Sequence, residues 1–369
     1  ALSGQLGPQG LDDPGLHEAL DLCLECRACK SECPTSVDMA RIKSEVLAAQ
    51  WDRGRAPLGV RAFGHVRGVA RLGSRFAGLA NAVARSRVGR AMNELLLGVD
   101  RRRTLPAWTS RTLSTRLRHA VARSPVRAVI FADTFTEHSD PEIGVAAFEL
   151  LDRAGIGARL VPHGCCARPL ISQGLLEEAR VVGGATVEAL HAAAERGEAI
   201  VFLEPSCLSA IREDVPALLR GLRRTRAETV ARQSVLFEPF LEDQLRAGRA
   251  TLRLKPGPTS VALHPHCHQR AMGLADAAAA LLRRIPGATV TDLDAGCCGM
   301  AGSFGYSRAH YAVSKAIGER KLLPAARAVP ASGVLVAAGT SCRHQVADFA
   351  AVDALHPAVL LRSLVEDDR

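Results

Sequence analysis

A cysteine pair occurs twice in this sequence, as His163-Gly-Cys-Cys-Ala167 and as Ala295-Gly-Cys-Cys-Gly299. A lone cysteine follows each pair at a similar distance: Cys207 comes 41 positions after the first pair, and Cys342 comes 44 positions after the second. Each lone cysteine comes directly after a run of β-branched and apolar residues that predicts a strand. The matched spacing predicts an internal duplication that places its cysteines in loops at the carboxyl ends of strands, where open α/β sheets bind ligands.

The chain around these motifs alternates short apolar runs with longer Ala- and Leu-rich runs, which is the pattern of repeated strand–helix–strand units. We therefore predict an α/β fold with strands at residues 128–132, 159–162, 199–203, 261–264, 288–291 and 334–337. The helices predicted between them include residues 141–154, 173–195, 269–284 and 308–323. Pro256-Gly257-Pro258 is a strong turn signal, and it separates two duplicated modules, residues 125–258 (the first copy) and 259–369 (the second copy).

The N-terminal region carries another cysteine motif, Cys23-Leu-Glu-Cys26-Arg-Ala-Cys29-Lys-Ser-Glu-Cys33-Pro34. This C-x2-C-x2-C-x3-C-P run is typical of bacterial ferredoxins, in which cysteine thiolates hold a [4Fe–4S] cluster. Either Cys33 closes this cluster or it serves a second cluster whose other ligands lie elsewhere. Tetrahedral zinc is the alternative occupant. Predicted helices at residues 16–22 and 39–49 flank the run, so residues 1–50 are predicted to form a helical ferredoxin module, half of a two-cluster module.

The second copy of the duplication contains a complete set of four sulfur ligands for an iron–sulfur cluster or a Zn²⁺ ion. The ligands predicted there are Cys267, Cys297, Cys298, Cys342 and His266. The first copy is less complete, because Thr136 or its neighbours stand in place of Cys267, and Ala167 stands in place of Gly299. A weaker metal site is predicted from Cys165, Cys166, Cys207 and His163, with Asp133 as another candidate ligand. The alternative for this copy is a group of buried structural thiols.

Residues 51–124 form a basic connector, in which positions 51–123 contain 16 Arg, no Lys and three acidic residues. Apolar residues between positions 60 and 83 recur every three or four positions, which predicts one face of a helix, while Arg67, Arg71 and Arg75 share another face. The connector has few aromatic residues and no recognition motif, so nucleic-acid binding is not expected. Its arginines either form a solvated face or dock against an acidic partner or an anionic membrane surface.

The composition of the 369 residues, 47% hydrophobic and 23% charged, is that of a globular protein and excludes disordered and fibrous classes. The 11 cysteines are clustered, which favours metal ligation over a disulfide framework. No apolar stretch is long enough to span a membrane, and the first residues lack the features of a secretory signal. We therefore expect a cytoplasmic protein, or one bound peripherally to the inner face of the cytoplasmic membrane.

These motifs resemble the iron–sulfur, C-terminal half of FAD-linked D-2-hydroxyacid dehydrogenases, the family of D-lactate and D-2-hydroxyglutarate dehydrogenases. The resemblance rests on the cysteine run that begins at Cys23, on Cys165-Cys-Ala-Arg-Pro-Leu170, on Cys297-Cys-Gly-Met-Ala-Gly-Ser-Phe-Gly305 and on Gly339-Thr-Ser-Cys-Arg-His344. Each copy is similar to the cysteine-rich CCG domain, which glycolate oxidase iron–sulfur subunits and the cysteine-rich subunit of heterodisulfide reductases also contain.

The resemblance implies an electron-transfer role. FAD on a partner subunit, or on a domain outside this chain, would oxidise the substrate, and the clusters would pass electrons to a quinone, cytochrome or flavoprotein. The chain is then expected to be a fragment or a separately encoded subunit that does not oxidise substrate alone. In the family, Cys23, Cys26 and Cys29 would hold one cubane and Cys33 the partner cubane. A catalytic cluster like that of heterodisulfide reductase, in the second copy, is the alternative, although Gln345 replaces a further cysteine there.

Overall fold

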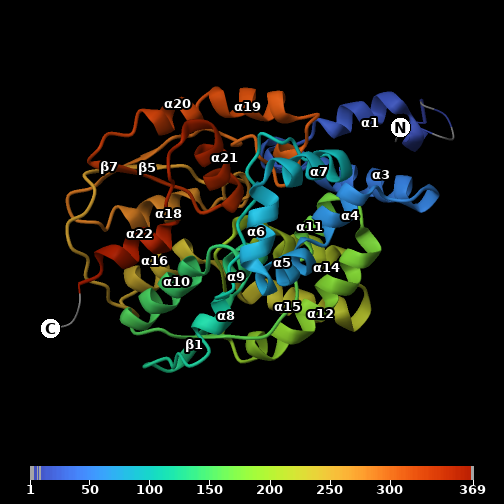
Figure 1. Cartoon of the computed structure of the whole chain (residues 1–369). Helices are drawn as coiled ribbons and strands as arrows, with labels where there is room; N and C mark the ends of the chain where they lie inside the picture. The colour runs from blue at the N-terminus through green and yellow to red at the C-terminus, as the bar shows by residue number, and fades with distance from the viewer. Residues whose placement is uncertain (1–3, 6, 8–9, 367–369) are drawn as a thin grey trace.

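The computed structural model describes residues 4–5, 7 and 10–366, and it has the predicted α/β architecture (Figure 1). Its strands form two parallel sheets, with the orders β2-β1-β3-β4 and β6-β5-β7. The strands are β1 (Val126–Phe131), β2 (Gly157–Leu160), β3 (Ala199–Phe202), β4 (Ser234–Leu236), β5 (Ser260–Leu263), β6 (Thr289–Asp292) and β7 (Gly333–Val336). In each sheet the first strand in sequence lies between the second and the third, as the predicted duplication requires.

Helices connect and cover both sheets. The first copy contains α9 (Thr134–His138), α10 (Pro141–Arg153), α11 (Arg168–Ser172), α12 (Leu176–Glu195), α13 (Pro205–Ser209), the π-helix η2 (Ala210–Asp214), α14 (Val215–Leu218), α15 (Gly221–Gln233) and α16 (Phe237–Arg246). The second contains α17 (Cys267–Ala271), α18 (Ala275–Leu282), the 3₁₀ turn η3 (Phe304–Tyr306), α19 (Tyr311–Glu319), α20 (Leu322–Arg327), α21 (Thr340–Ala350) and α22 (Pro357–Leu364).

One hydrophobic core joins the two sheets. Ile130 of β1 and Leu151 of α10 belong to the same buried cluster as Val261 of β5, Val336 of β7 and Leu361 of α22. Each of these side chains is almost completely buried, which is the burial that stabilises a folded domain most. The shared core therefore fixes the position of one sheet relative to the other.

The N-terminal segment contains η1 (Gly10–Asp12), α1 (Pro14–Asp21), α2 (Ala28–Glu32) and α3 (Met39–Arg53), in agreement with the two helices predicted around the cysteine run. Asp13 and Asp38 cap α1 and α3 by accepting hydrogen bonds from backbone N–H groups of the first turn. Among the described residues of this segment, the buried apolar side chains are Leu20, Ala40 and Val46. So small a core cannot stabilise the segment alone, and its packing against the two copies matters.

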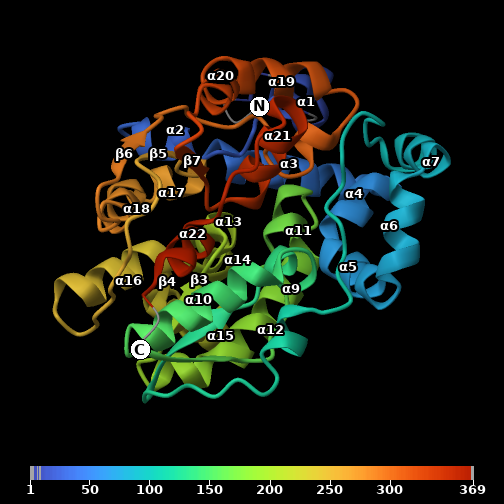
Figure 2. The same cartoon turned by 60° about the vertical axis from the view of Figure 1, so that its left-hand side comes forward.

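The basic connector is not the single helix that the periodicity predicts. It forms α4 (Leu58–Gly64), α5 (Val66–Arg75), α6 (Ala77–Arg85) and α7 (Arg87–Leu97), followed by α8 (Leu113–Arg116). The helical hydrogen bonding is interrupted at His65, Phe76 and Ser86. Figure 2 shows α4, α5, α6 and α7 together at one side of the molecule.

The side chains of the connector also differ from the prediction. The apolar residues predicted to share one helix face are partly at the surface, with Leu72 64% and Leu79 69% exposed. Arg67, predicted on a free polar face with Arg71 and Arg75, instead points inward and donates hydrogen bonds to the carbonyl oxygens of Ala132 and His163. Turns between short helices change which face each residue presents, and periodicity alone does not reveal them.

Smaller differences follow from local backbone geometry. The helix predicted at residues 269–284 is divided into α17 and α18, because Gly273 adopts a positive φ of 69°. The strand β2 begins two residues before the predicted position, and the three-residue strand β4 was not predicted. The cysteine loops nevertheless follow the carboxyl ends of the strands as expected.

Candidate functional site

The four cysteines predicted in the second copy come together at the carboxyl edge of its sheet. Cys267 follows β5, Cys297 and Cys298 follow β6, and Cys342 lies in the first turn of α21 after β7. The thiols are close enough to perturb one another: Cys297 raises the pKa of Cys267, Cys298 raises that of Cys297, and Cys342 raises that of Cys298. Four sulfurs from three separate loops therefore form one contiguous group.

This group of thiols suits an iron–sulfur cluster in its chemistry. The contact with Cys297, which favours the protonated Cys267 thiol, raises its pKa well above its usual range together with burial. Such thiols lose their protons when they ligate a cationic metal centre. The Gly299 N–H points at Cys297 Sγ, 3.4 Å away, and supplies the kind of N–H···S hydrogen bond that adjusts cluster potentials. Among the described residues, no three His, Cys, Asp or Glu side chains are arranged to hold a single metal ion as they stand.

His266 and Glu204 form a buried polar pair beside these thiols. The His266 ring caps α17 by accepting a hydrogen bond from the His268 N–H, and its Nε2 lies 3.9 Å from Glu204 Oε1. Burial opposes a charged ring, but Cys267 and Glu204 outweigh it and raise the pKa of His266 to about 9. Glu204 Oε2 also accepts a hydrogen bond of 2.8 Å from the Thr340 N–H at the start of α21.

Glu204 follows β3 of the first copy, whereas Thr340 and His266 belong to the second. It therefore connects the carboxyl ends of the strands in the two sheets. It contributes to the raised pKa of Cys342 in the second copy and of Cys207 in the first. Glu204 was not among the site residues predicted from the sequence. The sequence feature that could have identified Glu204 is its position at the end of an apolar strand, three residues before Cys207.

The first copy brings its three cysteines together as well. Cys166 donates a hydrogen bond of 2.9 Å to Cys207 Sγ, and the contact with Cys166, together with burial, raises the pKa of Cys165. The Cys166 hydrogen bond lowers the pKa of Cys207, but burial outweighs it and raises that pKa to about 12. Ala167 has a φ of 65°, which matches the positive φ of 91° at Gly299. The backbone of the Cys-Cys turn is therefore left-handed after the pair in both copies.

The two residues proposed to complete the first site have other partners. His163 Nε2 accepts a hydrogen bond from the Ala132 N–H, and Nδ1 lies 2.7 Å from the Gly164 carbonyl oxygen. The ring also stacks on Phe131. Asp133 caps α9 and accepts hydrogen bonds from the Thr136 N–H and hydroxyl. Burial, with a smaller contribution from Glu204, raises the pKa of Asp133 to about 6.

The N-terminal cysteine run, residues 23–33, forms a loop against the second copy, and we call it the ferredoxin loop. Cys26 lies close enough to Cys29 and Cys267 that both contribute to its raised pKa, although burial is the largest cause. The short helix α2 packs against α17, which begins at Cys267. The Met39 N–H points at Cys29 Sγ, 3.4 Å away. Two of the predicted sulfur sites are therefore neighbours.

Cys33 is placed differently from the other cysteines of the run. Its Sγ lies 3.2 Å from the Thr35 hydroxyl, and that hydrogen bond is the first cause of its lowered pKa. No other cysteine is among the main causes of this pKa shift. The structure thus groups Cys23, Cys26 and Cys29 electrostatically and leaves Cys33 outside the group.

A buried network of ion pairs fastens the ferredoxin loop to the first copy. Arg27 pairs with Glu213 and Asp214 at the end of η2, and Arg168 pairs with Glu25 and Asp214. The Arg27 and Arg168 side chains are 2% and 9% exposed, so the carboxylates are required to balance their charge. This network was not predicted, because its partners are far apart in the chain.

Gln345, which replaces a further cysteine of the related reductases, has a packing role. Its Oε1 accepts a hydrogen bond of 2.7 Å from Arg103, and its Nε2 donates one of 2.9 Å to the Ser314 carbonyl. The amide is completely buried. Gln345 therefore ties the connector to α19 and α21 behind the sulfur group.

Comparison with known proteins identifies the family. The CCG cysteine-rich domain matches residues 261–347. One subunit of the anaerobic glycerol-3-phosphate dehydrogenase of Escherichia coli K12 is 30% identical over 373 residues, which cover 97% of this chain and 91% of that protein. This chain belongs to the family of that subunit. The predicted membership of the FAD-linked iron–sulfur dehydrogenases is thereby confirmed.

Members of the broader group are longer. D-2-hydroxyglutarate dehydrogenase of E. coli K12 is 24% identical over 367 residues, which cover 95% of this chain but 35% of that protein. The enzyme of Pseudomonas putida is 24% identical over 358 residues, with 93% and 34% covered. The chain thus spans about a third of these enzymes. It is a component of an iron–sulfur electron-transfer oxidoreductase that works with a dehydrogenase partner.

Proposed function

We propose that this chain carries electrons from reduced flavin on a partner subunit or domain to a quinone, cytochrome or flavoprotein. Cys23, Cys26 and Cys29 would hold one [4Fe–4S] cluster, with Cys33 ligating a partner cubane. Cys267, Cys297, Cys298 and Cys342 would hold a second cluster. The packing of α2, within the N-terminal cysteine run, against α17, which begins at Cys267, carries this proposal, because electron transfer requires neighbouring redox centres.

The substrate would be oxidised on the flavin partner. The relatives act, by name, on glycerol-3-phosphate and on D-2-hydroxyglutarate. A hydroxyl-bearing acid or phosphate is therefore the proposed substrate class. Clusters, when bound, would supply one-electron transfer. The protein would supply hydrogen-bond donors to the sulfurs and hold the cysteine loops in position. N–H groups of Met39 and Gly299 donate to sulfurs of the two sites, and buried ion pairs hold the ferredoxin loop in place.

Anaerobic reconstitution with iron and sulfide, followed by EPR of the dithionite-reduced protein, tests the proposal. We expect two cluster signals, one lost in Cys26→Ser and the other in Cys298→Ser, with magnetic interaction between them in the unmodified protein. Cys207→Ser is the matched control, because it removes a cysteine from the incomplete first copy. Absence of any cluster signal from protein with intact thiols would overturn the proposal.

Zinc in the second copy remains the alternative occupant. Elemental analysis that finds about one zinc per chain, with iron only in proportion to the ferredoxin loop, would favour this structural role. A catalytic cluster would instead be favoured if the loaded chain alone reduced a disulfide and Cys298→Ser abolished that reduction.

The helices α5, α6 and α7 provide the proposed site of peripheral membrane contact. Nine large apolar side chains on or between them are exposed: Val69, Leu72, Phe76, Leu79, Val83, Val88, Met92, Leu95 and Leu96. Exposed arginines lie among them at positions 71, 75, 85 and 87. Apolar side chains with interspersed arginines suit the interface of an anionic bilayer. We call these residues the α5–α7 surface. None of the helices in the described part of the chain has the length and hydrophobicity needed to cross a membrane.

A further inference from the structure

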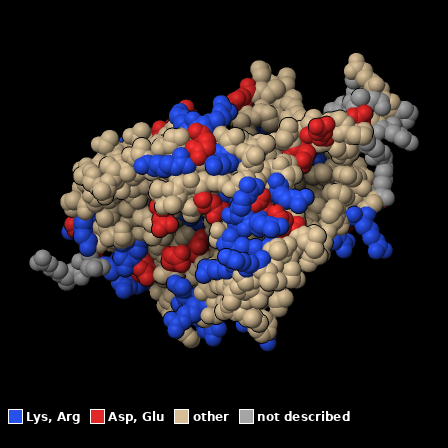
Figure 3. Space-filling view, turned by 45° about the horizontal axis from the view of Figure 1, so that its top comes forward, with Lys and Arg blue, Asp and Glu red and all other residues tan. Residues whose placement is uncertain are grey.

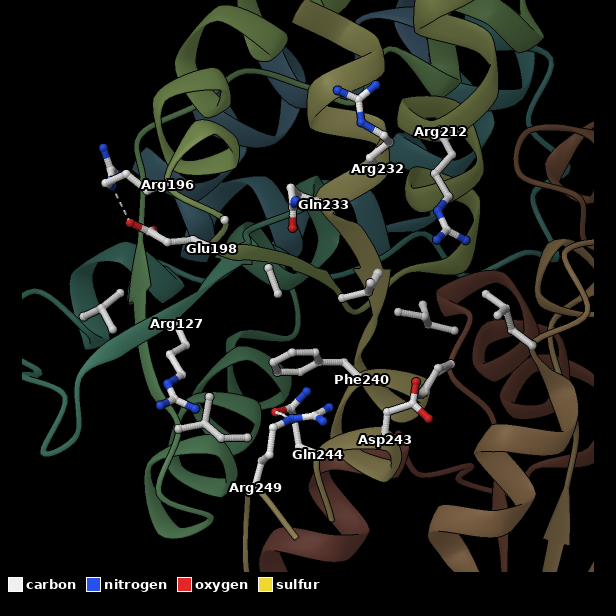
Figure 4. Close-up of a pocket in the computed structure, with 18 residues that line it drawn as sticks. Arg127, Arg196, Glu198, Arg212, Arg232, Gln233, Phe240, Asp243, Gln244 and Arg249 are labelled. Carbon is white, nitrogen blue, oxygen red and sulfur yellow. Dashed lines mark hydrogen bonds and ion pairs between the residues drawn. The ribbon is translucent and has the colours of Figure 1, made fainter. Parts of the chain in front are cut away.

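A cavity of about 540 Å³ lies away from the cysteines, at the opposite end of the first sheet. The first residues of β1 and β3 line it, together with β4 and α16. The cysteine loops follow the other ends of these strands. Figure 4 shows the labelled residues around the cavity on several separate segments.

Arginine dominates the polar lining of this cavity. Five arginines line it: Arg127, Arg196, Arg212, Arg232 and Arg249. The two acidic residues of the lining already have partners. Glu198 pairs with Arg159 and Arg196 at 2.8 and 2.7 Å, and Asp243 pairs with Arg246 at 2.9 Å.

The other four arginines of the lining have no carboxylate partner in the described part of the chain. Arg232 donates only to the Thr229 hydroxyl, and Arg249 donates to the Gln244 side-chain oxygen. Arg127 and Arg212 have no hydrogen-bond or ion-pair partner among the residues described. Arg212 is half-buried; burial lowers its pKa, and the neighbouring Glu213, which also pairs with Arg27 and Lys30, raises it.

The cavity also has an apolar side, formed by Ile156, Val235, Leu236, Pro239 and Phe240. We propose that it binds a small molecule that carries two or more phosphate or carboxylate groups. Guanidinium groups bind such oxyanions with paired, charge-assisted hydrogen bonds. Unpaired arginines from four segments fit a multivalent anion better than a single monovalent ion.

One side of the cavity is formed by a turn that also binds the ferredoxin loop. Arg212 belongs to η2, and the next two residues of that π-helix, Glu213 and Asp214, form the ion pairs with Arg27. π-Helical turns are rare and occur frequently at functional sites. A ligand on Arg212 would contact the same turn that holds the ferredoxin loop.

Calorimetric titration of the full chain at constant ionic strength tests the proposal, with pyrophosphate and citrate as probes. We expect at least one of them to bind, and Arg212→Gln to weaken that binding about tenfold or more. Arg180→Gln is the matched control, because Arg180 is exposed and paired with Glu177 on α12, outside the cavity. Circular dichroism and the unfolding temperature without ligand establish that both variants fold.

Binding of pyrophosphate alone would assign the phosphate class, and binding of citrate alone the carboxylate class. The double variant Arg127→Gln/Arg249→Gln provides an independent test, and we expect it to weaken the same titration. The proposal is overturned if neither probe binds, if the cavity variants bind as the unmodified protein does, or if only a glutamate-rich peptide binds. These outcomes do not depend on cluster content, so they are separate from the test of electron transfer.

Discussion

Arg168 shows how a single side chain can hold two parts of this molecule together. Its guanidinium pairs with Glu25 of the ferredoxin loop and with Asp214 of the first copy, and it is 9% exposed. Replacing it with Met would leave buried Glu25 with only the 3.9 Å contact to Lys43 and would remove one of the cations on Asp214. We expect Arg168→Met to lower the free energy of unfolding by roughly 3–5 kcal/mol, measured by denaturant titration.

The control for this variant is Arg224→Met. Arg224 pairs with Glu228 one helical turn away, and both side chains are about half exposed. Such surface pairs contribute about 0.5 kcal/mol or less. Equal losses in the two variants would contradict the structural role assigned to Arg168.

Glu238 predicts a specific pH dependence of stability. Its carboxyl group is completely buried and has no hydrogen-bond partner among the described residues. Burial, with a smaller contribution from Glu204, raises its pKa to about 7, against 4.5 for an exposed glutamate. The folded state holds this proton more tightly than the unfolded state does. The contribution of protonated Glu238 to the free energy of unfolding is therefore fully present below pH 4.5, and it is lost as the pH rises through 7.

Glu238→Gln removes this titration. We expect the variant to match the unmodified protein near pH 4.5 and to be more stable above pH 7, by up to about 3 kcal/mol. Thermal unfolding measured across this range gives the comparison. A difference between the two proteins that does not grow with pH would show that Glu238 does not titrate in this window.

The residues of the site were predictable to different degrees. The cysteines were found from spacing, because metal ligands recur at fixed short intervals. Glu204, Arg27 and Arg168 were not found, because each acts through a partner distant in sequence. Arg27 and Glu213, for example, are 186 positions apart. Only the fold shows that such residues meet.

At the scale of elements, the turn after Cys298 requires a residue with a positive φ and no Cβ atom. Gly299 has a φ of 91°, and a Cβ atom there would lie 2.4 Å from the Ser314 carbonyl oxygen. We expect Gly299→Ala to displace the turn and to lower iron content in the second copy, measured after reconstitution. Gly296 is the control: it also has a positive φ, but a Cβ there meets nothing within 4 Å. If Gly296→Ala lost as much iron, backbone strain rather than the contact with Ser314 would be the cause.

Strands were predicted more reliably than the connector. Each predicted strand lies within two residues of an observed one, because short runs of β-branched and apolar residues bounded by turn residues indicate strands directly. The missed strand β4 has only three residues. In the connector, the period of 3.6 correctly indicated helix, but Phe76 and Ser86 end helices without a Pro or Gly signal at those positions.

At the scale of the whole molecule, the charged and apolar groups of the surface are unevenly distributed. Figure 3 shows Lys and Arg in several groups on one face, with acidic side chains between them and broad areas of other residues. The α5–α7 surface combines arginines with exposed apolar side chains. We expect the protein to cosediment with vesicles that contain phosphatidylglycerol, and salt to weaken this binding.

Leu79→Asp and Leu95→Asp should each reduce vesicle binding about tenfold, because both side chains are highly exposed, 69% and 84%, on the α5–α7 surface. Leu222→Asp is the matched control, since Leu222 is 67% exposed on α15. Equal binding by all variants would contradict the membrane role. Binding only to an acidic protein partner would assign the surface to that partner instead.

The ion pairs beneath the ferredoxin loop also bear on how the protein is made. Cys23, Cys26 and Cys29 leave the ribosome long before Glu213 and Asp214, and at ordinary rates of translation the delay is roughly 10–40 s. During this interval the loop lacks its buried partners Glu213 and Asp214, although Lys43 is already made. A cluster delivered early meets an open loop, whereas one delivered late meets a loop already covered by the first copy. If these cysteines bind the proposed cluster, its loading would depend on the timing of synthesis.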